Sequence, residues 1–203
     1  MSNLFTIGHS KHTQDYFLRL LKKYNINYLL DVRSTPYSKY AEQYNKESIC
    51  TFLKREDIVY SFMGNSLGAR PTDNTLYSEQ GYLDFEKVAE SEKFNKAIDN
   101  VLLGLSKKNK IALMCTEKDP FECHRAILIA RAFSKRGVEV NHILADGSIQ
   151  TQRELDNRLL EKYFPDWNQL SIFNYKNNID EKEYLDQAYR KRNIDIGYNL
   201  KEE

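Results

Sequence analysis

Residues 110–136 read KIALMC, then TEKDPFE, then CHRAILIARAFSKR, and this stretch decides the fold. Residues 110–115 are an apolar run typical of a buried strand, and residues 116–122 are a polar turn. The spacing of the apolar side chains after Cys123 predicts a helix that ends at Gly137, because glycine suits the left-handed position beyond a helix. A strand, a turn and a helix in this order indicate an α/β protein.

The same alternation recurs along the chain. Strands that alternate with helices favour right-handed crossovers and a mostly parallel sheet, and strands that are apolar throughout are covered on both faces. We therefore predict an α/β fold with a mostly parallel five-strand sheet and helices on both faces, in a Rossmann-like three-layer arrangement. The four other strands are expected at 4–7, 27–32, 58–63 and 138–144, and the main helices at about 14–24, 84–105 and 150–163.

The chain changes character near Pro165. Residues 1–164 are expected to form a single α/β domain, and residues 165–203 a C-terminal helical extension rich in Asn, Lys, Asp and Tyr. Its helix is predicted at 180–192. We expect the extension to pack on the domain or on a partner subunit, which makes a homodimer a hypothesis.

Composition limits the partners. The chain has 203 residues and a net charge of +1, so nothing global attracts it to nucleic acid, although a nucleic-acid partner stays open. It has no run of about 18 apolar residues to span a membrane and no apolar signal segment at its start. Its odd number of cysteines, 3, is typical of reduced thiols in the cytosol, so a cytoplasmic location is expected.

Polar residues and glycines follow each predicted strand. In an open parallel sheet, ligands bind beyond the carboxyl ends of the strands, so these residues are expected to converge on one site. They are Gly8-His9-Ser10, Asp31 with Arg33, the glycine-bearing loop 64–68, Cys115, and His142 with Asp146.

Cys115 is the candidate nucleophile. A thiolate at the end of a strand that faces a helix start is stabilised by free N–H groups and by the helix dipole. His9 or His124 would serve as the base. The alternative is that Cys115 is a small buried strand residue, since cysteine is among the most buried residue types.

Arginines offer a clamp for an anion. Arg125 at a helix start is opposed by the helix dipole, and a bound phosphate or carboxylate would offset that cost. A salt bridge to Glu122 or Asp119 explains it equally well. Arg33 shares a strand face with Asp31, which either orients it or forms a structural ion pair with it.

Cys123 has three interpretations. It resolves an oxidised Cys115, ligates a metal, or simply begins the helix. The spacing Cys115-x7-Cys123-His124 departs from that of structural zinc sites, and adjacent Cys123 and His124 are not expected to aim at one ion. We therefore expect no metal and no cofactor.

Five motifs resemble a known family. TIGHS at 6–10, LLDVRSTPYS at 29–38, NSLGAR at 65–70, MCTEKDPFECHR at 114–125 and HILADGSI at 142–149 together resemble the family catalogued as domain of unknown function number 488, over about residues 4–163. The resemblance implies enzymatic activity from the cysteines, with no reaction attached, and it adds Ser10, Glu117 and Gly68 to the candidate substrate-binding residues. Ala69 stands where a second glycine is expected. The matching positions are Gly8, His9, Ser10, Asp31, Arg33, Pro36, Gly68, Cys115, Glu117, Cys123, His124 and Arg125.

The leading hypothesis is a thiol-dependent hydrolase or transferase that acts on an anionic or nucleotide-like small molecule at the carboxyl end of the sheet. The catalytic candidates are Cys115, His9, His124 and Asp31, and the substrate-binding candidates are Arg33, Arg125, Cys123, Glu117, Ser10 and Gly68.

Two alternatives stay open. One is a non-catalytic module that binds a nucleotide or nucleic acid with the same cleft and the aromatic loop 71–82. The other is a redox or metal site that uses Cys115 and Cys123.

Overall fold

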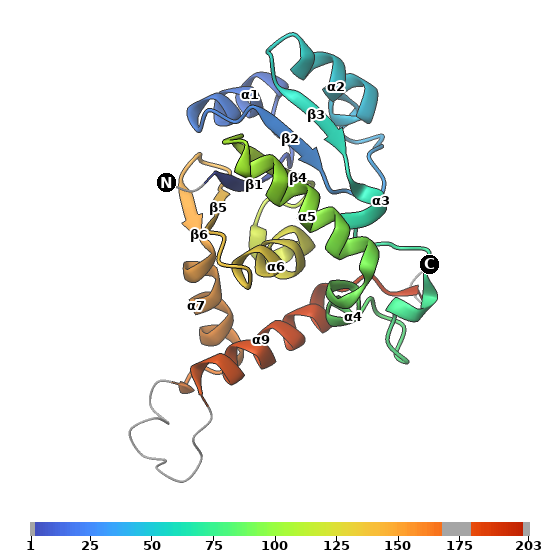
Figure 1. The fold of residues 1–203 in the computed structure, drawn as a ribbon, viewed down its shortest axis with the longest axis vertical. Helices are drawn as coiled ribbons and strands as arrows, with labels where there is room; N and C mark the ends of the chain where they lie inside the picture. The colour runs from blue at the N-terminus through green and yellow to red at the C-terminus, as the bar shows by residue number, and fades with distance from the viewer. Residues whose placement is uncertain (1–2, 168–179, 201–203) are drawn as a thin grey trace.

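The computed structural model describes residues 3–167 and 180–200 of the chain. Its centre is a six-strand sheet in the order β3-β2-β4-β1-β5-β6 (Figure 1). The first five strands are parallel and the sixth is antiparallel to β5, which confirms the predicted α/β fold with a mostly parallel sheet. The strands are β1 (Leu4–Gly8), β2 (Tyr28–Asp31), β3 (Val59–Phe62), β4 (Ile111–Cys115), β5 (Val140–Ile143) and β6 (Ile149–Thr151).

Strand β6 is not among the five predicted strands. Its three residues are half-buried and too short to show a strand pattern, so the sequence predicts only a turn that leads into a helix. That helix, α7 (Gln152–Tyr163), begins directly after the strand. Thr151 ends the strand and caps the helix, with a reciprocal hydrogen bond to Glu154.

Alternate residues of β4 face opposite layers of helices. Ile111, Leu113 and Cys115 belong to one core cluster, and Ala112 and Met114 to the other. Cys115 therefore faces the same layer as the helix that follows it in sequence. The layer on the Cys115 side contains α5 (Glu92–Ser106), α6 (Arg131–Ser134) and α7, and the opposite layer contains α1 (Gln14–Lys23) and α2 (Lys46–Lys54).

The glycine-bearing segment 64–68 is a helical turn, α3 (Gly64–Leu67), and not the predicted loop. A side chain at Gly64 would place its Cβ 2.0 Å from the Arg33 carbonyl oxygen, so glycine is needed for this close packing. The remaining short elements are η1 (Glu42–Tyr44), η2 (Asn74–Leu76), α4 (Phe85–Glu90) and η3 (Pro120–Glu122).

The helix predicted from Cys123 to Arg136 begins with a π-helical segment, η4 (Arg125–Ala130), before it continues as α6. A π-helix has the same apolar pattern at this length as an α-helix, so the sequence does not distinguish them. Such segments are rare and are frequent at functional sites. Here the segment starts directly after His124.

Helix α9 (Glu181–Ile196) runs from α7 toward α4 along one side of the domain (Figure 1). Arg192 donates from Nε to the Phe121 carbonyl over 3.0 Å, and Asn193 donates from Nδ2 to the Leu83 carbonyl over 2.8 Å. The helix predicted at 180–192 is therefore present and is anchored by buried polar contacts within the same chain. Residues 168–179 of the predicted extension lie outside the described residues. No helix in the described part of the chain has the length and apolar character needed to cross a membrane.

His142 joins the sheet to α7 through a buried chain of hydrogen bonds. Its Nδ1 lies 2.8 Å from the Thr6 hydroxyl, and its Nε2 lies 3.0 Å from Oε1 of Gln152. Because an amide oxygen only accepts, Nε2 carries the proton and Nδ1 accepts from Thr6. Burial, together with the charge of Arg125, lowers the pKa of His142 to about 3, so the ring is neutral.

We expect His142 to make the protein sensitive to acid. His142 takes up a proton near pH 6.5 in the unfolded chain and only near pH 3 in the folded chain. The contribution of the neutral ring to the free energy of unfolding is therefore complete above about pH 6.5 and is lost as pH falls. The wild type should lose up to about 1.4 kcal/mol of unfolding free energy per pH unit from this group. Urea unfolding of wild type and His142→Gln between about pH 7 and pH 4 should show their difference narrowing toward acid. A difference that is constant with pH would contradict this assignment.

Candidate functional site

The turn after β4 brings three buried side chains together. Asp119 accepts a hydrogen bond from the Phe121 amide over 2.9 Å and so starts a tight turn that returns the chain toward Cys115. Nδ1 of His124 then lies 3.9 Å from Cys115 Sγ and 3.8 Å from Cys123 Sγ. We call Cys115, Cys123 and His124 the thiol cluster.

A single backbone contact fixes the imidazole of His124. Its Nε2 lies 3.1 Å from the carbonyl oxygen of Val32, just beyond β2. A carbonyl oxygen accepts only, so Nε2 carries a proton in either charge state of the ring. In the neutral ring, the lone pair of Nδ1 is therefore directed at the two sulfurs.

The two thiols have opposite electrostatic surroundings. The hydrogen bond to Cys123 and burial raise the pKa of Cys115 well above its ordinary value. Burial also opposes ionisation of Cys123, but the hydrogen bond from Cys115 and the charges of Arg125 and His124 outweigh it and lower the pKa of Cys123. The negative charge of the cluster therefore resides on Cys123, whose Sγ also accepts the Arg125 amide over 3.4 Å.

Glu117 shares a proton with Cys123. Its Oε2 lies 2.9 Å from Cys123 Sγ, a distance at which a proton on either group is hydrogen-bonded to the other. Burial and the negative charge of Cys123 raise the pKa of Glu117. The carboxyl group is thus a proton carrier beside the cluster.

A second network surrounds Asp31. Arg33 forms a buried bidentate ion pair with it, from Nε to Oδ1 over 2.9 Å and from Nη2 to Oδ2 over 2.6 Å, and the Tyr60 hydroxyl donates to Oδ2 over 2.7 Å. Nη1 of Arg33 donates to Nε2 of His9 over 3.2 Å. We call these four residues the Asp31 network. It neutralises much of the charge of Arg33 and holds its guanidinium in place.

His9 belongs to this network and not to the thiol cluster. Its Nδ1 bonds the Ser10 carbonyl over 3.0 Å, so both ring nitrogens are engaged. Burial and the charge of Arg33 lower the pKa of His9 to about 4, which keeps the ring neutral. Of the two predicted bases, the structure places His124 beside the sulfurs and His9 behind Arg33.

Arg125 stabilises the turn after β4 from its buried side. It is fully buried, and it donates from Nη1 to the Glu117 carbonyl over 2.9 Å and from Nη2 to the Lys118 carbonyl over 3.4 Å. Gly8 permits this arrangement, because a Cβ there would lie 1.9 Å from the Glu117 carbonyl oxygen. The predicted anion clamp at Arg125 is instead a brace that binds backbone oxygens.

A cavity of about 380 Å³ opens at the carboxyl end of β2 and β4, and we call it the site cavity. It contains four predicted site residues, Arg33, Cys115, Glu117 and His124. Its other lining residues, which the sequence reasoning did not select, are Ser34, Thr35, Tyr37, Ala69, Arg70 and Thr116. Thr116 follows β4, and the others come from the loops after β2 and α3, where the motifs STPYS and GAR were the available signal.

Most of the remaining predicted residues stand behind the cavity, but two do not converge on it: His142 lies between Thr6 and Gln152, and Asp146 lines a different pocket. Gly68 packs closely, since a Cβ there would lie 2.3 Å from the Gly64 carbonyl oxygen. Ser10 has a φ of 46° and its amide donates to the Thr116 carbonyl over 2.9 Å, so it shapes the turn. Asp31, Cys123 and Arg125 likewise act on residues that line the cavity.

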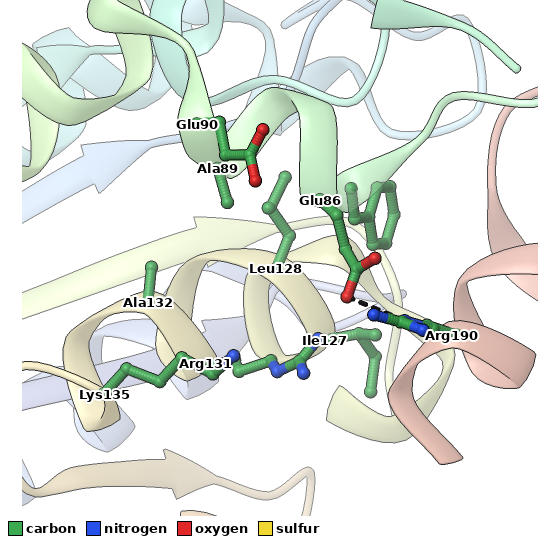
Figure 2. Close-up of a pocket in the computed structure, with 10 residues that line it drawn as sticks. Glu86, Ala89, Glu90, Ile127, Leu128, Arg131, Ala132, Lys135 and Arg190 are labelled. Carbon is green, nitrogen blue, oxygen red and sulfur yellow. Dashed lines mark hydrogen bonds and ion pairs between the residues drawn. The ribbon is translucent and has the colours of Figure 1, made fainter. Parts of the chain in front are cut away.

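A separate hollow of about 260 Å³ lies between α4, the η4–α6 helix and α9 (Figure 2). Its rim carries an ion pair between Glu86 and Arg190 at 3.0 Å, over a floor that includes Ile127 and Leu128. Its lining residues include no cysteine or histidine. This hollow therefore offers neither a thiol nucleophile nor a histidine base.

Comparison with protein families found a match to the family model described as Domain of unknown function DUF488, over residues 13–132. This confirms the resemblance seen in the sequence, over a shorter range than expected. The matched range includes the Asp31-Val32-Arg33 segment and the whole thiol cluster. Searches of curated proteins and of solved structures found no match.

Gly8→Ala should disturb the turn that carries the cluster. The added methyl group collides with the Glu117 carbonyl and lies 3.2 Å from Nη2 of Arg125, so we expect a loss of about 1–3 kcal/mol in the free energy of unfolding. Gly104→Ala in α5 is the matched control, since its Cβ meets only the end of the Ile111 side chain at 3.0 Å. Because alanine favours a helix, the control should be neutral or more stable by up to about 1 kcal/mol. Equal urea midpoints for the two variants would be evidence against the close approach.

Proposed function

Because the chain belongs to the family described as Domain of unknown function DUF488, which names no reaction, we propose its function from the site itself. The protein is a thiol-dependent enzyme that acts on a small anionic molecule held in the site cavity. Cys115 is its nucleophile, and the Cys123–His124 pair is its base.

The observation that carries the proposal is the alignment of Cys115, His124 and the Val32 carbonyl. Cys115 lines the cavity, its Sγ lies 3.9 Å from Nδ1 of His124, and Nε2 of that ring is fixed on Val32 over 3.1 Å. A nucleophile, a base and a group that orients the base are the arrangement expected for covalent catalysis. The distance between Cys115 Sγ and His124 Nδ1 is long for a hydrogen bond. Such catalytic contacts often shorten when substrate binds.

Attack by Cys115 requires that its proton be removed. Because its pKa is raised, the thiol keeps its proton at rest and loses it as the sulfur attacks. The proton passes to the Cys123–His124 pair as a bond forms between Sγ and the electrophilic atom of the substrate. Glu117, which also lines the cavity and has a raised pKa, is placed to protonate the leaving group.

The cavity favours an anion with several oxygens. Arg70 is exposed at the rim, and its guanidinium lies 4.2 Å from the ring of Tyr198. Arg33 contributes less charge, because Asp31 neutralises it, although an N–H of Nη1 is left after the bond to His9. The hydroxyl groups of Ser34, Thr35 and Thr116 also line the cavity.

Two exposed tyrosines support the alternative of a nucleotide-binding module without chemistry. Tyr37 is 52% exposed and Tyr40 is 100% exposed, both on the loop that borders the cavity, and an aromatic ring there offers a face for stacking on a base. Under this alternative, a mononucleotide raises the thermal unfolding midpoint while Cys115 stays inert.

Alkylation by two reagents of different charge tests the proposal. Iodoacetate is an anion and iodoacetamide is neutral, and the exposed thiol of Cys50 gives an internal reference within the same molecule. With a chelator present, we expect the iodoacetate-to-iodoacetamide rate ratio at Cys115 to exceed that at Cys50 by roughly tenfold, because the cavity concentrates anions. Peptide mass spectrometry measures each rate separately.

Three variants control this experiment. Arg70→Gln should bring the ratio at Cys115 toward that at Cys50, whereas Arg153→Gln, which removes the same charge from an exposed position on α7, should leave it unchanged. His124→Gln should slow Cys115 with both reagents. An iodoacetate-to-iodoacetamide rate ratio at Cys115 no higher than that at Cys50 in the wild type would overturn the proposal.

A further inference from the structure

The donor atoms of the thiol cluster converge as metal ligands do. The sulfurs of Cys115 and Cys123 and a ring nitrogen of His124 all lie within 4.8 Å of one another, and all three side chains are buried. Among the residues that the structure describes, this is the one set of three such groups. We infer that these three residues form a binding site for a zinc ion.

The distances fit a tetrahedral ion. Zinc lies about 2.3 Å from sulfur and about 2.0–2.1 Å from nitrogen, so a sulfur and a nitrogen on one tetrahedral ion stand roughly 3.6 Å apart. Nδ1 of His124 lies 3.9 Å from Cys115 Sγ and 3.8 Å from Cys123 Sγ. A contraction of a few tenths of an ångström brings both sulfur–nitrogen pairs to this separation.

The outer contacts of His124 are those of a ligand. A histidine that binds a metal through one nitrogen usually donates its other N–H to a carboxylate or a backbone carbonyl, which fixes the ring. His124 donates from Nε2 to the Val32 carbonyl over 3.1 Å and leaves Nδ1 for the ion. The Arg125 amide, at 3.4 Å, gives Cys123 Sγ the equivalent support.

The backbone explains how adjacent residues reach one point. Cys123 is extended, with φ −138° and ψ 136°, whereas His124 has the helical values φ −56° and ψ −26°. The change from one conformation to the other turns the two side chains to the same side. The expectation that adjacent Cys123 and His124 do not aim at one ion is therefore wrong. It rested on the spacing of the residues in the sequence, which does not show the change in backbone conformation between them.

The donor set selects the metal. Two thiolates and an imidazole favour zinc and disfavour the hard ions Mg²⁺ and Ca²⁺. Cys115 and His124 face the site cavity, which leaves a fourth position open on that side. Binding displaces into solvent the thiol protons that the cluster still carries.

The inference does not depend on the proposed function. Zinc occupies the sulfur lone pairs that the proposed attack needs, so the zinc-bound chain and the reactive thiol are alternative states of one site. The two proposals are therefore separable: alkylation in chelator tests the thiol, and added zinc tests the metal.

Metal titration of the full chain tests the site. Protein freed of metal by a chelator and then exchanged into plain buffer is given Zn²⁺ alone, and bound zinc is measured after gel filtration. We expect one zinc ion per chain and protection of Cys115 and Cys123 from iodoacetamide, while Cys50 continues to react. Co²⁺ in place of Zn²⁺ should give the thiolate charge-transfer and visible bands of a tetrahedral sulfur site.

Paired variants separate this site from adventitious binding. Cys123→Ser and His124→Gln should lose the stoichiometric zinc and the cobalt bands, whereas the matched controls Cys50→Ser and His12→Gln, at a distant exposed thiol and a partly exposed ring, should keep both. The cobalt spectrum of the wild type needs no variant to fold. Zinc that protects neither buried thiol, or that binds equally to Cys123→Ser and wild type, would overturn the inference.

Discussion

The buried guanidinium of Arg125 is the constraint on which the site depends. A charge removed from water is costly unless its surroundings compensate, and this one is fully buried. Its partners are the carbonyls of Glu117 and Lys118 and, at 3.9 Å, the Glu117 carboxylate, so the cost is offset when the turn after β4 closes over it. Gly8 makes room for that closure on the neighbouring strand. The arginine therefore fixes the turn that returns Cys123 and His124 toward Cys115.

The same charge sets the protonation of its neighbours. It favours the thiolate of Cys123 and disfavours protonation of His9 and His142. On the other side of the cavity, three consecutive residues contribute to the Asp31 network and to the thiol cluster. Asp31 and Arg33 form the buried ion pair, while the carbonyl of Val32 between them orients His124. The end of β2 therefore supports both networks at once, which explains why the site cavity forms between β2 and β4.

The sequence predicts what depends on apolar periodicity and on strand ends. Five strands are recognisable because apolar residues run through them continuously or alternate along them. Cys115, Glu117, His124 and Arg33 meet because carboxyl ends of parallel strands share an edge. The role of Arg125 was not predictable, since a cation at a helix start fits an external anion as well as two carbonyls. Arg70 was missed because its position depends on α3, a helical turn whose glycine-rich sequence predicts a loop. Periodicity also cannot separate a π-helix from an α-helix over six residues.

Adjacent Cys123 and His124 show why local spacing is a weak guide to chemistry. Spacing rules assume a regular backbone between ligands, but here the chain changes from extended to helical within two residues. Because this change brings the two sulfurs and Nδ1 of His124 together, these atoms can bind either protons or a metal ion. Protons leave Cys115 free to attack a substrate in the cavity, and an ion ties both sulfurs to His124. Because binding a metal releases the thiol protons, falling pH favours the protonated state and rising pH the metal-bound state. The contact between Nε2 of His124 and the Val32 carbonyl is common to both states, so the imidazole keeps its position when the site changes from one to the other.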